Sequence, residues 1–245
     1  MCGLTPSYDS EVSTNSASAL LHLQQFADSA LPIGGAAHSF GLEALVELGL
    51  VDAENLAGLL TEYLQESGTL EGCYCAASCE LSHSPLSEEA LDQWIFWNVE
   101  LGARKLAREP RDGSASMGRR FLMLAAGVSD IPELSRVADF ALRHQSEVHL
   151  APCFGLTAGL MQIDPELAAA AYLQQSVTTL LSCCQRLLPL GQTAAQRILW
   201  NLKPAIMSAA HRGASTPLEY LDSFTVMLDL ASARHPSQHT RLFIS

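Results

Sequence analysis

Lysine is almost absent from this chain. Only Lys105 and Lys203 are lysines, and 14 basic residues face 26 acidic ones, which gives a net charge of −12 over 245 residues. Nucleic-acid binders carry a basic surface, so this charge balance argues against that role. Charged residues make up only 16% of the chain and hydrophobic residues 48%. With so few charges for its surface, we expect part of that surface to be covered by a partner or by a second copy of the chain.

Long apolar runs are missing as well. The longest, residues 121–128, is far shorter than the roughly 20 residues that span a bilayer, so we predict no membrane segment. Residues 1–19 are polar and rich in Ser and Thr, without the positive start and apolar stretch of a secretory signal, and we interpret them as a flexible tail. Seven cysteines without such a signal indicate reduced thiols in the cytoplasm rather than a disulfide framework.

Motifs for catalysis and for phosphate binding are also missing. The sequence contains no nucleophile elbow, no HExxH and no Walker A loop, and no GK[ST] follows the glycines after Pro32. His38 and Glu43 lie close in sequence, but we interpret them as a structural contact or a helix start rather than an acid–base pair. We therefore predict no catalytic residue, and we expect that the chain is not an enzyme.

Cysteine and histidine gather in one segment, at Cys73, Cys75, Cys79 and His83. Cys79 and His83 have the i, i+4 spacing that places two metal ligands on one face of a helix. A zinc site of the usual kind needs a second pair of ligands, and no second CxxC occurs. We therefore interpret these thiols as buried core residues and predict no metal site and no bound cofactor. A metal site formed by these residues is the alternative.

Helical periodicity dominates the rest of the chain. One face is formed by apolar residues at i, i+3, i+4, i+7 and i+8, namely Leu56, Leu59, Leu60, Tyr63 and Leu64. Similar faces recur at residues 173–184 and 195–209, and we expect Pro204 to kink the second of these helices. Strict two-residue alternation is absent, and no connection is long enough to be an interdomain linker. The sequence predicts an all-α, single-domain bundle of about ten helices over residues 20–245.

Basic residues concentrate in one short stretch. Six of the 14 lie within it: Arg104, Lys105, Arg108, Arg111, Arg119 and Arg120. In an acidic chain such a stretch forms a local basic patch, which suits a partner rich in carboxylates or phosphates. A helical corner held by internal ion pairs explains the same residues equally well, and the sequence leaves both interpretations open.

Five segments stand out as motifs: residues 23–43 with DSALPIGG and HSFGLE, residues 116–122 with SMGRRFL, residues 152–164 with PCFGL, residues 186–199 with RLLPLGQTAAQRIL, and residues 238–245 with QHTRLFIS. In this order they resemble the signatures of the urease accessory protein UreF family. The resemblance extends from about Leu20 to the last residue, which is almost the whole chain beyond the tail.

The resemblance implies an all-helical protein that dimerises and binds UreD (also called UreH) together with the GTPase UreG. This assembly helps to load nickel into apo-urease, so nickel would be the cargo of the complex. A scaffold of this kind acts by raising the local concentration of carrier and recipient. Whether it alters GTP hydrolysis by UreG is left open. We expect partner contacts from the following residues: Arg241, Leu242, Phe243, Gln192, Thr193, Arg119 and Arg120.

The C-terminal segment departs from the family pattern. His239 and Ile244 replace the usual Tyr and Arg, and His235-Pro236 stands where many relatives have HE. Either the partner protein has changed together with these residues or the segment binds its partner more weakly.

We interpret a further set of residues as structural turns, because glycine adopts backbone conformations that other residues disfavour: Pro32, Gly34, Gly35 and Gly191.

Overall fold

The computed structural model describes residues 10–221, 226–234 and 242–244. These ranges contain helices and no strand, which confirms the predicted all-α, single-domain bundle. None of the described helices combines the length and the hydropathy needed to cross a bilayer. The α-helices are α1 (Ser10–Phe26), α2 (Leu42–Glu47), α3 (Leu56–Tyr63), α4 (Thr69–Leu81), α5 (Glu88–Arg104), α6 (Arg108–Val128), α7 (Pro132–Arg143), α8 (Leu150–Leu160), α9 (Pro165–Leu187), α10 (Gln192–Asn201), α11 (Lys203–Ser215) and α12 (Val226–Arg234).

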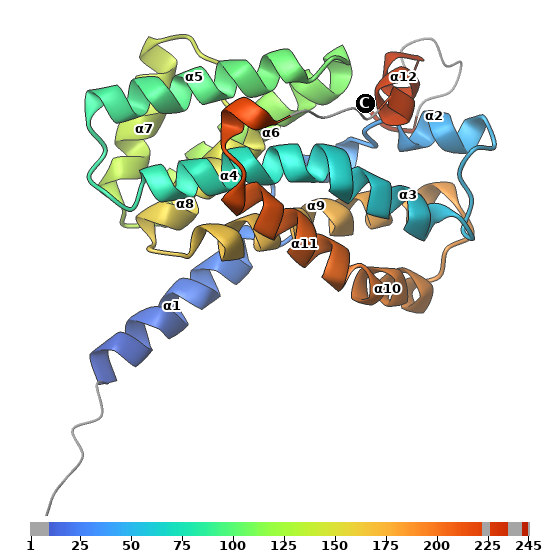
Figure 1. The fold of residues 1–245 in the computed structure, drawn as a ribbon, viewed down its shortest axis with the longest axis horizontal. Helices are drawn as coiled ribbons and strands as arrows, with labels where there is room; N and C mark the ends of the chain where they lie inside the picture. Colours follow the sequence, from blue (N-terminus) through green and yellow to red (C-terminus); the bar gives the residue numbers. More distant parts are fainter. Residues whose placement is uncertain (1–9, 222–225, 235–241, 245) are drawn as a thin grey trace, which may run out of the picture.

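Helices α4 and α8 form the centre of the bundle, and α5, α6, α9 and α11 pack around them, while α7 packs on α6 and α5 (Figure 1). Every residue of α8 from Leu150 to Gly159 is buried. The two central helices approach closely because α8 carries glycine at the contact. A Cβ at Gly155 would collide with the backbone of Cys75 in α4. Part of the segment 152–164 therefore serves core packing.

The apolar face predicted around residue 60 is confirmed. It belongs to α3 and to the π-helical turn η2 (Leu64–Gly68) that follows. Leu56, Leu60 and Leu64 are each no more than 1% exposed. Burial of three leucines in successive turns fixes α3 against the core, since a fully buried leucine contributes about 2 kcal/mol.

Pro204 separates two helices instead of kinking one. α10 ends at Asn201, α11 begins at Lys203, and Leu202 lies between them. Proline has no backbone N–H to donate inside a helix, but in the first turn that group has no intrahelical acceptor anyway. The prediction of a single kinked helix over residues 195–209 is therefore wrong, although both halves are helical.

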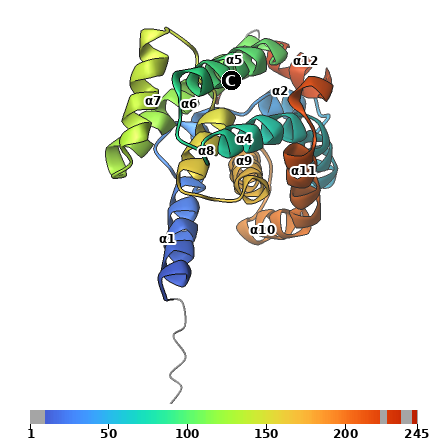
Figure 2. The same cartoon turned by 60° about the vertical axis from the view of Figure 1, so that its left-hand side comes forward.

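Helix α1 extends away from the body of the molecule (Figure 1, Figure 2). Its C-terminal part is anchored by Leu23 and Phe26, which are 3% and 4% exposed. The helix begins at Ser10, within the stretch that composition predicted as a flexible tail. A helix once anchored propagates into polar residues at little cost, which accounts for the helical conformation of residues 10–19. Residues 1–9 lie outside the described residues.

Candidate partner-binding surface

The turn before α2 contains residues with positive φ values, and two of them are glycines. Gly34 and Gly41 have φ values of +92° and +89°, and Phe40 between them has φ +52°. Residues other than glycine rarely adopt this left-handed region. A Cβ at Gly41 would also lie 2.6 Å from the hydroxyl oxygen of Ser232 in α12. The turn therefore brings α12 close and places Glu43 in the first turn of α2.

Glu43 holds the C-terminal segment of the chain. Its carboxylate accepts the backbone N–H of Leu242 at 2.6 Å and that of Phe243 at 3.2 Å. The next amide, Ile244 N–H, donates to the carbonyl of Ala37 at 2.8 Å. Hydrogen bonds to an ionised acceptor are stronger than neutral ones, and two of these three are of that kind. Together they fix three successive residues against the start of α2 and the carbonyl of Ala37.

Arg186, near the end of α9, forms the other side of this contact. Its guanidinium lies 4.3 Å from the centre of the Phe243 ring, as in a cation–π interaction. The same side chain donates to the carbonyl of Ala36 at 3.0 Å. Three of the segments that carry the family resemblance, 23–43, 186–199 and 238–245, thus meet at one surface. The motifs in the sequence predicted the three segments, but they did not predict that Glu43 and Arg186 make the contacts between them.

The docked segment turns its side chains in alternate directions. Phe243 is 5% exposed, whereas Leu242 and Ile244 are 53% and 67% exposed. Phe243, predicted as a contact for a partner, is thus buried against its own chain. The outward positions belong to Leu242 and to Ile244, one of the residues that depart from the family pattern. Arg241, His235, Pro236 and His239 lie outside the described residues.

The two other sets of predicted contact residues are solvent-exposed. Arg119 and Arg120 lie on α6, and Arg120 donates to the carbonyl of Ile33 at 3.4 Å, beside the turn at Gly34. Gln192 and Thr193 are exposed in the first turn of α10. Their contact with a partner stays a prediction.

The remaining turn residues differ in what they require. Gly35 is buried, and a Cβ there would meet Thr179 and Met117 at ordinary contact distances, while Pro32 is exposed. Gly191 has φ −70°, and a Cβ would meet no atom within 4 Å. The turn at Gly191 therefore does not depend on the conformational freedom of glycine, unlike the turn at Gly34.

Internal ion pairs account for half of the basic stretch. Arg104 pairs with Glu100 at 2.9 Å, and Arg108 pairs with Asp112 at 3.2 Å. Lys105 is paired with Glu71 of α4, which also accepts a hydrogen bond from the hydroxyl of Tyr172. The other three residues of the stretch, on α6, remain available for a basic patch: Arg111, Arg119 and Arg120.

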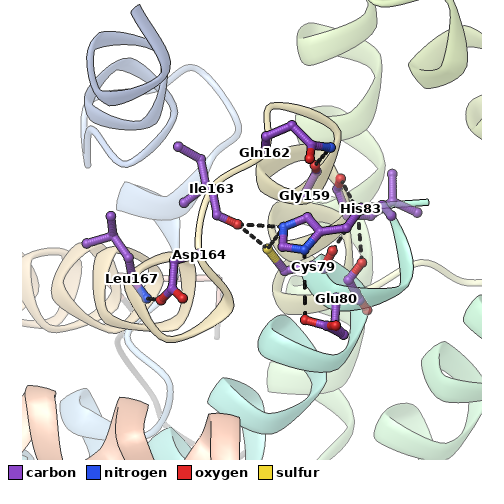
Figure 3. A network of polar contacts seen from close by, with 11 residues as sticks. Cys79, Glu80, His83, Gly159, Gln162, Ile163, Asp164 and Leu167 are labelled. Carbon is purple, nitrogen blue, oxygen red and sulfur yellow. Dashed lines mark hydrogen bonds and ion pairs between the residues drawn. The ribbon is translucent and has the colours of Figure 1, made fainter. Parts of the chain in front are cut away.

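Cys79 and His83 lie side by side, as their spacing predicted (Figure 3). The sulfur is 3.9 Å from Nε2 of the imidazole. Both groups also contact the carbonyl oxygen of Ile163, at 3.2 Å from the thiol and 2.8 Å from Nε2. Burial raises the pKa of Cys79 to about 12, with further contributions from Asp164 and Glu80, so the thiol is protonated at neutral pH. Within the described ranges, no three His, Cys, Asp or Glu side chains group to hold a metal ion.

The all-α fold and the docked C-terminal segment together define a helical-bundle protein that holds its own C-terminal segment at its surface. The model of the UreF family matches residues 50–203. The chain is similar to three proteins named urease accessory protein UreF. That of Nostoc sp. is 32% identical and aligns over 92% of this chain and 95% of its own length. The protein of Pseudomonas fluorescens is 34% identical and aligns over 94% of this chain and 100% of its own length. The protein of Paenarthrobacter aurescens is 32% identical, with the same two coverages of 94% and 100%. The chain belongs to the UreF family of urease accessory proteins.

Proposed function

We propose that this protein is a cytoplasmic scaffold that helps to load nickel into apo-urease. In this role it forms a homodimer and bridges UreD/UreH and the GTPase UreG. Membership of the family supports the connection with urease. The docked C-terminal segment supports the bridging role, because it presents a defined apolar edge at the surface.

The observation that carries the proposal is the alternation in the docked segment. Leu242 and Ile244 point outward and Phe243 points inward. Glu43 holds the backbone of the segment before any partner arrives. A partner that binds a segment already ordered pays less conformational entropy than one that must order it first. We therefore assign Leu242 and Ile244 to the contact with UreD/UreH.

The mechanism is one of positioning. Nickel is the cargo and moves between its carrier and apo-urease by ligand exchange, while the scaffold holds the two together. Tethering of this kind gives effective concentrations in the millimolar range. An influence on UreG would require the scaffold to bind one nucleotide state better than the other.

Co-purification with UreD and UreG by size-exclusion chromatography tests the proposal. We expect the full-length chain to form a joint complex, and the chain cut after His235 to lose it. The double variant Leu242→Asp, Ile244→Asp should lose the complex as well, because charges replace both outward side chains. Leu142→Asp is the control, since Leu142 is 76% exposed on α7, on another part of the molecule. The proposal is wrong if the double variant and the control bind alike.

The alternative, a carrier that binds nickel itself, rests on the 3.9 Å separation of Cys79 and His83. Thiolate and imidazole are suitable ligands for such an ion. Equilibrium dialysis separates the two functions. Stoichiometric nickel binding that is lost in Cys79→Ala would favour the carrier, and binding that does not respond to this change would leave the scaffold as the function.

A further inference from the structure

A cavity of about 340 Å³ lies between α5, the first turns of α6 and the loop that precedes α8. None of its lining residues belongs to the surface on which the C-terminal segment docks. Its lining combines polar groups with a small apolar wall formed by α5. The residues that the argument uses are Val99, Gly102, Arg111, Ser146, Glu147 and His149.

His149 is the unusual member of this lining. The residue is 0% exposed, yet neither ring nitrogen has a hydrogen-bond partner among the described residues. Its backbone is fixed, because His149 N–H donates to Asn98 at 2.7 Å. A Cβ at Gly102 would lie 2.8 Å from Nε2, which places the ring against the cavity wall. A buried polar group without a partner is costly in a folded protein, so an unpartnered imidazole beside a cavity is evidence for a ligand.

The electrostatics around the ring favour an anion. His149 immediately precedes α8, and its side chain does not cap the first amides of that 11-residue helix. The positive end of the helix dipole therefore lies at the ring. Arg111 lines the same cavity, and the nearby charge of Glu71 is compensated by Lys105. Burial, Lys105 and Arg111 lower the pKa of His149 to about 4, against an opposing influence of Glu71. The neutral ring offers one N–H donor at physiological pH.

We propose that this cavity binds an oxyanion of the phosphate type, held by the guanidinium of Arg111 and an N–H of His149. Ser146 also lines the cavity, and its hydroxyl is a third possible donor. The volume exceeds that of a phosphate alone, and Val99 gives part of the wall an apolar character. The anion is therefore either a free phosphate or a phosphate ester with a small apolar group. Glu147, exposed on the rim, is the one carboxylate of the lining and opposes binding.

The test is an NMR titration of the ¹⁵N-labelled full-length chain that follows the ring resonances of His149. Inorganic phosphate and phenyl phosphate are the two probes, and tighter binding of one of them identifies the free anion or the ester as the ligand. We expect a saturable shift of the His149 resonances and a rise in the pKa of the ring. Arg111→Gln should weaken binding about tenfold, which corresponds to the loss of one charge-assisted contact.

Arg108→Gln is the matched control. It removes the same charge three residues earlier in α6, at a residue that pairs with Asp112 and does not line the cavity. Glu147→Gln should strengthen binding about twofold. A misfolded variant would bind more weakly, so tighter binding cannot be caused by misfolding. The inference is overturned if neither probe shifts the His149 resonances at about 10 mM. Equal weakening by Arg111→Gln and Arg108→Gln would also overturn it, since general surface charge would then explain the effect.

Discussion

Glu43 and Phe243 stand 200 positions apart in the chain and are joined by a hydrogen bond, from the Phe243 N–H to the Glu43 carboxylate, at 3.2 Å. The same carboxylate accepts the neighbouring amide of Leu242 at 2.6 Å. One side chain at the start of α2 therefore sets the conformation of the C-terminal segment, and the presentation of Leu242 depends on it.

Glu43→Gln should release this segment without unfolding the bundle. The amide side chain keeps the shape, but it loses the charge and one of the two acceptor oxygens, so only one of the two backbone N–H groups keeps its acceptor. We expect hydrogen exchange at the amides of Leu242 and Phe243 to become about tenfold faster. Glu62→Gln, the same change on the exposed face of α3, should leave that exchange unaltered. Protection that persists in Glu43→Gln would show that other contacts hold the segment.

Arg186 and Phe243 should be energetically coupled through the cation–π contact. A double-mutant cycle with Arg186→Ala and Phe243→Leu should give a coupling energy of about 0.5 to 1 kcal/mol. The readout is exchange of the Ile244 amide, which is bonded to the carbonyl of Ala37 and reports on docking. Strict additivity of the two substitutions would mean that ring and guanidinium lie close without stabilising each other.

Two glycines of α6 should respond in opposite ways to alanine. A Cβ at Gly118 would collide with the backbone carbonyl of Val148, whereas a Cβ at Gly127 would meet no atom within 4 Å. We expect Gly118→Ala to cost about 2 kcal/mol, because the backbone of the loop before α8 must move. The melting temperature should then fall by roughly 5 °C. Gly127→Ala should stabilise the protein by up to about 1 kcal/mol, since alanine is the better helix former. Similar melting temperatures would contradict the close packing at Gly118.

The two lysines of the chain should differ in their effect on stability. Burial alone would raise the pKa of Glu71, but the charge of Lys105 and hydrogen bonds from Lys105 and Tyr172 bring it below its ordinary value. The ionised Glu71 therefore stabilises the folded state. This stabilisation is complete above a pH of about 4.5 and is lost as the pH falls through the lower pKa that Glu71 has in the folded state. Lys105→Met leaves a buried carboxylate without its partner, which we expect to cost about 3 kcal/mol at pH 7.

In Lys105→Met the pKa of Glu71 should rise, because only burial and the remaining neighbours act on it. The deficit relative to the parent chain should therefore shrink as the pH is lowered from about 7 to about 5. Lys203→Met is the control, since Lys203 contacts Gln174 at an exposed position and its loss should stay within about 0.5 kcal/mol. Urea denaturation at each pH measures both variants. A deficit that is independent of pH would show that Glu71 is not the group responsible.

The helices were predictable because they follow from local patterns. The leucines of α3 recur with the helical period, and Asp164 before Pro165 marks the start of α9, where its side chain accepts the N–H of Leu167. Pro204 was misjudged because the same residue kinks a helix in its interior and begins one at its first turn. Which of the two occurs depends on how α10 and α11 pack on their neighbours.

The candidate site was predictable only as a set of segments. The motifs at residues 23–43, 186–199 and 238–245 were visible in the chain, but their contact was not. Phe243 and Leu242 are both apolar, and only the docked position of the segment decides that one is buried and the other exposed. The basic stretch was ambiguous for the same reason, since Lys105 takes its partner, Glu71, from another helix.

The sequence by itself determined the all-helical class, the absence of a catalytic motif and the family, because periodicity, helix breakers and motifs are properties of residues close together in the chain. Only the tertiary structure decided where Glu43, Arg186 and His149 act. A carboxylate, a guanidinium or an imidazole takes its role from the groups that surround it, and in a helical bundle those groups come from helices far apart in sequence.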